Sequence, residues 1–96
     1  MDYTEKVLIL LSVYNGNQFL GEQLKSIVEQ EDVEIELMIR DDGSTDNTEE
    51  IIDEWSGKIV INYWKGENIG AAKSFMELLR NAPEDYTFYA FADQDD

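Results

Sequence analysis

Three aspartates, Asp93, Asp95 and Asp96, stand together after a mostly apolar segment of the sequence. Carboxylates crowded in this way repel one another, and a divalent cation relieves that repulsion. The chain contains no histidine and no cysteine, so a metal must be held by oxygen ligands, which suit Mg²⁺ or Mn²⁺. The cluster predicts a metal site that can also bridge the oxygens of a diphosphate. The alternative interpretation is a solvated chain end.

A second acidic pair, Asp41 and Asp42, precedes Gly43. A carboxylate at the end of a strand can accept hydrogen bonds from a nucleobase imide or a ribose hydroxyl. The alternative is ordinary turn chemistry, since Asp-Gly-Ser is common between a strand and a helix. Asp46 is expected to cap the helix that follows, with Glu49 returning the bond in a capping box. The pattern does not fit a calcium loop, because Gly43 comes too early.

Weaker candidates follow two other expected strands. Tyr14 and Asn15 stand where the first apolar run ends, and a phenol ring can stack on or flank a base. Asn68 and Gly70 precede an expected helix, and Lys73, one turn into it, can neutralise phosphate. The alternative interpretation treats these residues as an ordinary turn, a loop with a helix start, and a surface lysine.

The spacing of apolar residues predicts alternating strands and helices. Residues 7–13 are almost all apolar, which is typical of a strand buried on both faces of a parallel sheet. In the third helix, the expected buried face consists of Ala72, Phe75, Met76 and Leu79. The expected strands are residues 7–13, 35–40, 59–64 and 86–92, and the expected helices are residues 19–30, 47–56 and 71–81.

This βαβαβαβ order predicts an α/β fold with a parallel, doubly wound, Rossmann-like sheet and right-handed crossovers. In such a sheet the ligand lies beyond the carboxyl ends of the strands. Each of the polar segments follows one of the expected strands, so we expect them to meet at one rim. The length of 96 residues allows one domain.

The charge of the chain excludes some partners. Asp and Glu number 22 and Lys and Arg number 7, so the formal net charge of -15 repels nucleic acid and anionic membrane surfaces. The first six residues are polar and do not resemble a secretory signal. The longest apolar run, residues 7–11, is far below the roughly 20 residues that cross a bilayer. We expect the chain itself to be soluble and cytoplasmic, and not to bind nucleic acid.

Four motifs in this order, each at the end of an expected strand, resemble those of the family 2 inverting glycosyltransferases of the GT-A fold. The resemblance covers residues 7–96, and it implies that residues 1–96 are the nucleotide-sugar-binding half of a glycosyltransferase domain. Arg40 and Gln94 are most similar to bacterial rhamnosyltransferase-like members, which build cell-surface polysaccharide. The motifs are Ser12-Val13-Tyr14-Asn15, Asp41-Asp42-Gly43-Ser44-Thr45-Asp46, Asn68-Ile69-Gly70 and Asp93-Gln94-Asp95-Asp96.

The resemblance implies roles for individual residues in holding a UDP- or dTDP-linked sugar. Ser12 and Tyr14 correspond to positions that contact the nucleobase, and Asp42 corresponds to one that binds base or ribose. Asp41 is implied to support the same loop. The residues that we predict to bind the nucleotide sugar, from the motifs and from the sequence, are Ser12, Tyr14, Asn15, Asp41, Asp42, Asn68, Gly70, Lys73, Asp93 and Asp95.

The last motif is implied to hold the metal. Asp93 and Asp95 match the outer members of the family's D-x-D motif, and Asp96 matches a position that can approach the metal and the diphosphate. The resemblance therefore implies Mg²⁺ or Mn²⁺ on these three residues. Lys73 is a looser match to a basic position near the phosphates.

In the implied reaction, an acceptor hydroxyl attacks the anomeric carbon with inversion, while the metal offsets charge on the departing nucleoside diphosphate. The general base that takes the hydroxyl proton is a carboxylate well downstream of the D-x-D motif, as is most of the acceptor site. No catalytic residue is therefore assigned here, and we expect a truncated domain that cannot transfer sugar alone. The whole protein is expected to act on a polysaccharide or lipid-linked acceptor at the inner face of a bacterial membrane, with rhamnose as a candidate sugar.

Three other interpretations remain open. A sugar-phosphate nucleotidyltransferase shares the α/β architecture but needs a glycine-rich, basic loop after its first strand, which residues 12–17 lack. A phospho-acceptor receiver domain carries its acidic pair after the first strand, whereas here the pair follows the second. A non-catalytic acidic interaction module would bind neither metal nor nucleotide. Without later strands, the sheet is also expected to end in an exposed edge through which the chain can self-associate.

Overall fold

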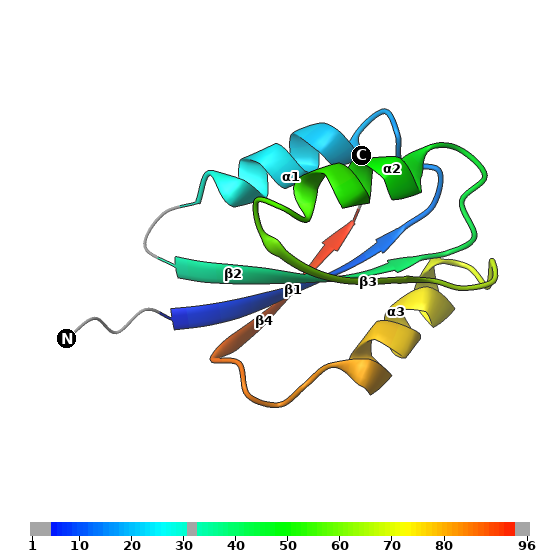
Figure 1. Cartoon of the computed structure of the whole chain (residues 1–96). Coiled ribbons are helices and arrows are strands. Elements are labelled where there is room, and N and C mark those ends of the chain that lie inside the picture. The colour runs from blue at the N-terminus through cyan, green and yellow to red at the C-terminus, as the bar shows by residue number, and fades with distance from the viewer. Residues whose placement is uncertain (1–4, 31–32, 94–96) are drawn as a thin grey trace.

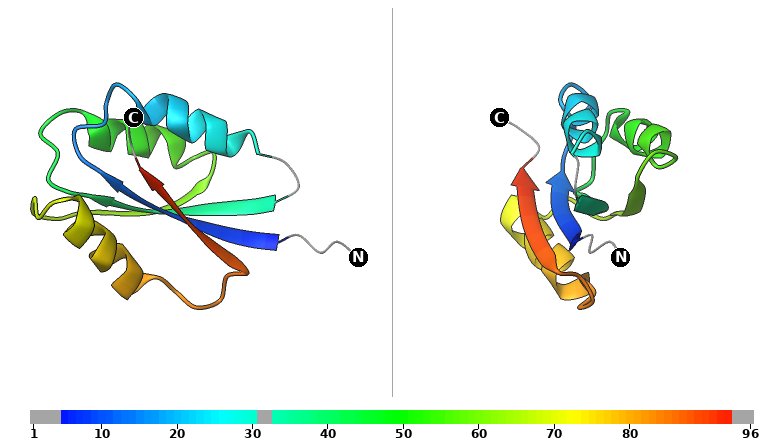
Figure 2. Two further views of the ribbon diagram at one scale, coloured as in Figure 1. Left: turned by 180° about the vertical axis from the view of Figure 1, so that it is seen from behind. Right: turned by 90° about the vertical axis from the view of Figure 1, so that its left-hand side faces the viewer.

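Four parallel strands form one sheet in the order β3-β2-β1-β4 in the computed structural model, which describes residues 5–30 and 33–93 (Figure 1). Helices α1 and α2 cover one face of the sheet and α3 covers the other (Figures 1 and 2). The predicted α/β fold with a parallel, doubly wound sheet is thus confirmed. The elements are β1 (Glu5–Val13), α1 (Leu20–Val28), β2 (Val33–Asp41), α2 (Thr48–Trp55), β3 (Val60–Lys65), α3 (Ala71–Asn81) and β4 (Phe88–Asp93).

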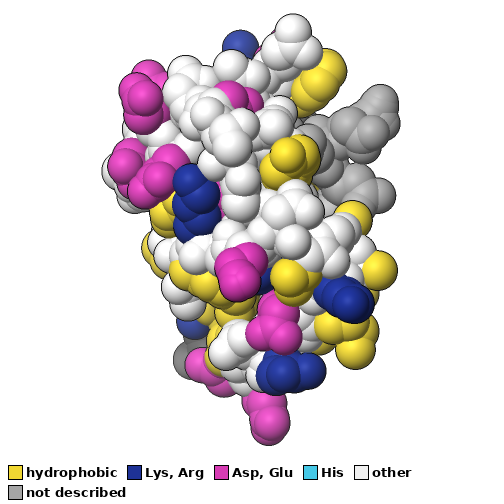
Figure 3. Space-filling view, turned by 90° about the vertical axis from the view of Figure 1, so that its right-hand side faces the viewer, with side chains coloured by type: hydrophobic (Ala, Val, Ile, Leu, Met, Phe, Trp, Pro, Cys, Tyr) yellow, Lys and Arg dark blue, Asp and Glu magenta, His cyan; other side chains and the backbone are white. Residues whose placement is uncertain are grey.

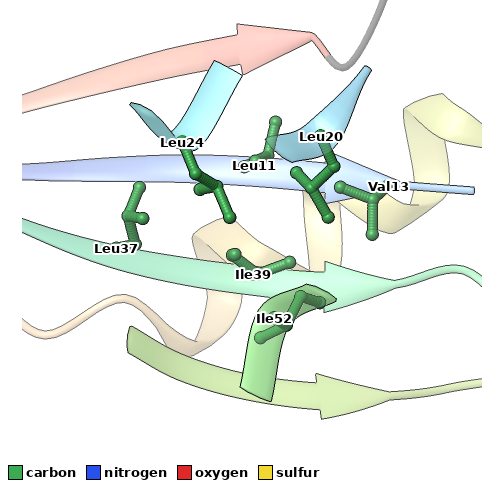
Figure 4. Close-up of a cluster of buried hydrophobic side chains, with 7 residues drawn as sticks. All are labelled: Leu11, Val13, Leu20, Leu24, Leu37, Ile39 and Ile52. Atoms are coloured by element: carbon green, nitrogen blue, oxygen red, sulfur yellow. The ribbon is translucent and has the colours of Figure 1, made fainter. Parts of the chain in front are cut away.

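The larger part of the core lies between the sheet and the pair α1 and α2. Alternate residues of β1 and β2 point to this side, because successive side chains of a strand face opposite ways. Helices α1 and α2 meet them with aliphatic residues at helical spacing. The fully buried members of this cluster are Leu11, Val13, Leu20, Leu24, Leu37, Ile39 and Ile52 (Figure 4).

The core on the α3 side is smaller. It consists of Leu8, Leu10, Met38 and Leu78, which are buried, with half-buried aromatic residues around them. Because β1 contributes Leu8 and Leu10 here and its other residues to the opposite cluster, this strand is buried on both faces. The continuous apolar run that predicted a covered parallel strand is explained by this position.

The predicted buried face of α3 is wrong. Ala72, Met76 and Leu79 are exposed, and of the four predicted residues only Phe75 is half-buried. The helix instead faces the sheet with Ser74 and Leu78, which are both fully buried. The side-chain hydroxyl of Ser74 is hydrogen-bonded to two residues of the sheet, and this polar contact fixes the rotation of the helix.

The start of α2 also differs from the predicted capping box. The helix begins at Thr48 after Asn47, and Asp46 lies one residue earlier. Asp46 still accepts hydrogen bonds from the backbone N–H groups of Thr48, at 3.0 Å, and of Asn17, at 3.2 Å. Glu49 lies instead near the hydroxyl of Tyr63, where burial and then the charge of Glu49 raise the pKa of the phenol to about 12.

None of the helices in the described ranges is long and apolar enough to cross a membrane.

The rotation of α3 is tested by substituting two adjacent leucines. Leu78→Ala empties a fully buried site, so we expect it to lower the free energy of unfolding by about 2–5 kcal/mol. Leu79→Ala, on the exposed side, should cost less than about 1 kcal/mol. Urea unfolding followed by circular dichroism measures both changes, and equal losses would contradict the orientation of α3 described above.

Candidate functional site

A cavity of about 270 Å³ opens at the carboxyl ends of β1 and β2, beside the start of α3. This is the rim at which ligands bind in parallel α/β sheets. Figure 3 views the molecule from this end, where acidic side chains are spread over the left, middle and lower parts of the view, with Lys and Arg side chains and uncharged surface among them. The residues that line the cavity are Ser12, Val13, Tyr14, Asp42, Asn68, Gly70, Ala71 and Phe75. The structure therefore brings together five of the predicted site residues, namely Ser12, Tyr14, Asp42, Asn68 and Gly70.

Asp42 joins the end of β2 to the loop before α3. Its Oδ1 atom accepts a hydrogen bond from the N–H of Ile69 at 2.8 Å, and its Oδ2 atom accepts one from the N–H of Gly70 at 3.0 Å. The side-chain amide of Asn68 donates to the backbone carbonyl of Asp42 at 3.0 Å. Asp42 therefore holds the opposite wall of the cavity in place while lining the cavity itself.

Arg40 is the ionic partner of Asp42. Both side chains are buried, and the Nη1 atom of Arg40 lies 2.8 Å from the Oδ1 atom of Asp42. The same nitrogen donates to the hydroxyl of Ser74 at 2.9 Å, and Nη2 donates to the carbonyl of Glu67 at 3.1 Å. A side chain at Gly66 would collide with this guanidinium group, because a Cβ atom there would lie 2.2 Å from Nη2.

These contacts keep Asp42 ionised. Burial alone raises the pKa of its carboxyl group, but hydrogen bonds from Ile69, Arg40 and Gly70 outweigh burial and hold the pKa below its ordinary value. An ionised carboxylate is an acceptor only, with room for about four hydrogen bonds. Oδ2 accepts a single hydrogen bond from the described residues, so Asp42 can still accept another from a ligand.

The side chain of Asp41 stabilises the turn after β2 and does not line the cavity. Its Oδ1 atom accepts a hydrogen bond from the N–H of Ser44 at 2.9 Å, and its side chain is fully buried. Gly43 between them has a φ of 85°, and a Cβ atom at this position would lie 3.0 Å from the backbone nitrogen of Asn68. The turn therefore requires glycine at position 43, because the positive φ disfavours other residues and a side chain would crowd the backbone of Asn68.

Asn15 joins the two loops at the rim. Its φ is 49°, which is uncommon outside glycine and is tolerated by asparagine. Its backbone N–H donates to the hydroxyl of Ser44 at 2.8 Å, and its Oδ1 atom accepts from the N–H of Thr45 at 2.8 Å. Asn15 thus positions the neighbouring Tyr14, which is exposed at the mouth of the cavity.

The outcomes differ for Lys73 and for the last acidic motif. Lys73 is exposed on α3 and does not line the cavity. The backbone of Asp93 is paired with Ser12, so β4 ends beside the cavity. Asp95 and Asp96 lie outside the described residues, and the described residues contain no group of three acidic side chains that could hold a metal.

Sequence reasoning missed five residues of the site. Val13, Ala71 and Phe75 line the cavity, and Phe75 had been assigned to the buried face of α3. Arg40 could have been recognised from the sequence, because a charged residue two positions after Met38 falls on a buried face of an apolar strand. No sequence signal marked Ser74, because its burial depends on its hydrogen bond with Arg40 of β2.

The ion pair is tested by a double-mutant cycle. Arg40→Met leaves the carboxylate of Asp42 buried without its cation, so we expect a loss of about 3–5 kcal/mol in the free energy of unfolding. The double variant Arg40→Met/Asp42→Asn should recover part of that loss, because it removes the unpaired charge. Urea unfolding of both single variants and the double variant measures the coupling, and strictly additive losses would contradict it.

The depressed pKa of Asp42 predicts a dependence of stability on pH. Its contribution is fully present above the pKa of the unfolded chain, about 4, and is lost as the pH falls through the lower pKa of the folded protein. Asp46 contributes in the same direction, since hydrogen bonds from Thr48 outweigh burial there. Urea unfolding as a function of pH should therefore show a smaller slope in Asp42→Asn than in the matched variant Asp53→Asn, whose carboxylate is exposed on α2. Equal slopes would contradict the assignment.

Comparison with known proteins finds a family and close structural counterparts. The family model described as "Glycosyl transferase family 2" matches residues 8–96. The dTDP-rhamnosyl transferase RfbG of Shigella flexneri is 44% identical over 91 residues, covering 90% of this chain and 32% of that protein. This chain thus spans about a third of that relative's length.

Two solved structures share the fold. S. aureus TarS 1-349 in complex with UDP-GlcNAc has a TM-score of 0.84 at 28% identity, over 94% of this chain and 26% of that one. The mannosyltransferase PcManGT of Pyrobaculum calidifontis, in complex with GDP-Man and Mn²⁺, has a TM-score of 0.74 at 25% identity, over 84% of this chain and 25% of that one. Together with the family match, they support the GT-A form of the sheet that the motifs predicted. This chain belongs to glycosyltransferase family 2.

Proposed function

We propose that this chain is the nucleotide-sugar-binding half of a glycosyltransferase domain, and that the cavity between β1, β2 and α3 holds the nucleoside of a UDP- or dTDP-linked sugar. The observation that carries the proposal is the convergence of Ser12, Tyr14 and Asp42 on one cavity at the carboxyl ends of the strands. The UDP-GlcNAc complex of TarS, which has the same fold, supports a nucleotide sugar as the ligand.

Asp42 gives the cavity a preference for bases that carry an imide N–H. The ionised carboxylate can accept a hydrogen bond but cannot donate one. Uracil and thymine present a donor at N3, whereas cytosine presents an acceptor at the same position. Cytosine would therefore leave two acceptors facing each other, which costs binding energy.

The metal belongs at the end of β4 in this proposal. Asp93, Asp95 and Asp96 would hold Mg²⁺ or Mn²⁺, and the carboxylate donors, with no histidine or cysteine in the chain, fit such a hard cation. The pairing of Asp93 with Ser12 supports a metal close to the nucleoside cavity. When bound, the ion neutralises charge on the diphosphate. The Mn²⁺ complex of PcManGT is consistent with this assignment.

The remaining predicted residues keep their roles as proposals. Asn15 and Asn68 act by positioning the two loops that border the cavity, and Gly70 presents its N–H group to Asp42. Lys73 stands exposed on the first turn of α3, from where a long flexible side chain can approach the phosphates.

For the whole protein, we propose transfer of a sugar with inversion, with its general base in a segment that this chain does not contain. The similarity to a dTDP-rhamnosyl transferase supports dTDP-rhamnose as the donor. We further propose a cytoplasmic location, with the whole protein at the inner face of a bacterial membrane, where a polysaccharide or lipid-linked acceptor is accessible. The chain of 96 residues alone should bind the donor without transferring sugar.

The proposal predicts ligand-dependent changes in NMR spectra. Addition of UDP or dTDP with Mg²⁺ should shift the backbone amide signals of Tyr14, Asp42 and Asp95. CDP should bind about ten-fold more weakly, because it lacks the imide donor. Absence of a shift at all three amides in millimolar ligand would overturn the proposal.

A pair of charge-matched variants separates the metal site from the cavity. Asp95→Asn should remove the part of the affinity that depends on the metal while leaving metal-free binding of UDP unchanged. Asp53→Asn, which removes the same charge from the exposed side of α2, should retain both. Isothermal titration with and without Mg²⁺ measures the difference, and equal affinities of the two variants in Mg²⁺ would contradict the metal assignment.

A further inference from the structure

Four polar side chains form a chain of hydrogen bonds that begins and ends at the cavity. Ser12 lines the cavity, and its hydroxyl oxygen lies 2.7 Å from that of Ser74. The Nη1 atom of Arg40 donates to the hydroxyl of Ser74 at 2.9 Å and to the Oδ1 atom of Asp42 at 2.8 Å. Asp42 lines the cavity as well, whereas Arg40 and Ser74 are buried between the two ends.

Arg40 sets the direction of this chain. A guanidinium group only donates hydrogen bonds. Both contacts of its Nη1 atom are therefore donations, one to the carboxylate of Asp42 and the other to the hydroxyl oxygen of Ser74. The guanidinium group is held in place by the ion pair and by the carbonyl of Glu67. The oxygen of Ser74 is thus fixed as an acceptor toward Arg40.

The proton of the Ser74 hydroxyl then has one acceptor. Hydroxyl groups rotate, so either of two hydroxyls 2.7 Å apart can donate to the other. Within residues 5–30 and 33–93, however, the hydroxyl of Ser74 has hydrogen-bond partners only in Arg40 and Ser12. Ser74 is fully buried, and a buried O–H group without an acceptor is costly. Donation from Ser74 to Ser12 is the arrangement that satisfies every group.

The proton of the Ser12 hydroxyl is left for a ligand. Ser12 is half-buried at the wall of the cavity, so its O–H group can point into the cavity while its oxygen accepts from Ser74. The cavity then offers two different polar groups, a hydroxyl that donates and the carboxylate of Asp42 that accepts. The imide of a base presents the complementary pair, because a carbonyl oxygen that accepts lies beside an N–H group that donates.

We propose that Ser74 is a positioning residue that fixes Ser12 as a hydrogen-bond donor to one of the two carbonyl oxygens that flank N3 of uracil or thymine. This inference rests on the proposed function, which assigns the cavity to the nucleoside. One nitrogen of Arg40 then supports both halves of the recognition, since it contacts Asp42 directly and orients Ser12 through Ser74. Ser74 is fully buried and acts on the base only through Ser12.

The direction of the hydrogen bond between the two serines can be observed without a ligand. Neutron diffraction from deuterated crystals should locate deuterium on the oxygen of Ser74, pointing toward the oxygen of Ser12. Deuterium on Ser12 that points toward Ser74 would overturn the inference, whether or not the protein binds a nucleotide. The binding of UDP tests the proposed function separately, so the failure of one is distinguishable from the failure of the other.

Thio-substituted nucleotides test the donation from Ser12 to the base. Sulfur accepts hydrogen bonds weakly, so one of the pair 2-thio-UDP and 4-thio-UDP should bind the unchanged protein about ten-fold more weakly than UDP. Ser12→Ala should abolish this difference, whereas Ser26→Ala, which removes an exposed hydroxyl from α1, should retain it. Isothermal titration measures the affinities. If both thio-nucleotides bind as tightly as UDP, or if Ser12→Ala keeps the full difference, the donor role of Ser12 is wrong.

Ser74→Ala separates positioning from packing. This variant keeps the hydroxyl of Ser12 but allows it to rotate away from sulfur, so the penalty for the same thio-nucleotide should fall from about ten-fold to about three-fold. A residue that only packs α3 against the sheet would, when removed, weaken UDP and the thio-nucleotide by the same factor, and that result would contradict the positioning role. The neutron measurement and Ser12→Ala test the inference even if circular dichroism shows that Ser74→Ala does not fold.

Discussion

The buried ion pair of Arg40 and Asp42 is the interaction on which the rest of the site depends. Removing two charges from water is costly, and the cost is recovered only where every remaining donor and acceptor is satisfied. Arg40 is satisfied by Ser74 and by the carbonyl of Glu67, and Asp42 by the N–H groups that precede α3. A single pair on β2 thereby fixes both the loop and the helix that form the far wall of the cavity.

This polar wall determines which side of α3 faces the sheet. Ser74 has to reach both Arg40 and the hydroxyl of Ser12, which lies 2.7 Å away, so the serine side of the helix turns inward. The apolar stripe that contains Met76 and Leu79 is turned outward as a result. The exposure of this stripe is thus a consequence of how the wall of the cavity is built.

The sequence predicted those features that depend on one segment alone. The apolar run of residues 7–13 indicated a strand covered on both faces, and Ala71–Asn81 was predicted as a helix with its observed bounds. The sequence could not predict the burial of Ser74, because its hydrogen-bond partners, Ser12 and Arg40, are distant from it in the sequence. The φ of 49° at Asn15 likewise depends on two loops that meet only in the folded chain.

Asp41 and Asp42 show why adjacent identical residues take different roles. Side chains alternate along a strand, so Arg40 and Asp42 project to the α3 side while Asp41 projects to the opposite side. There the charge of Asp41 contributes to the raised pKa of Tyr63, whose ring packs against the α1 and α2 cluster. The carboxylate on that side closes the turn through Ser44, and the one on the α3 side borders the cavity. Shifting the strand by one residue would exchange the two roles, so the register of β2 against β1 determines which carboxylate a ligand can reach.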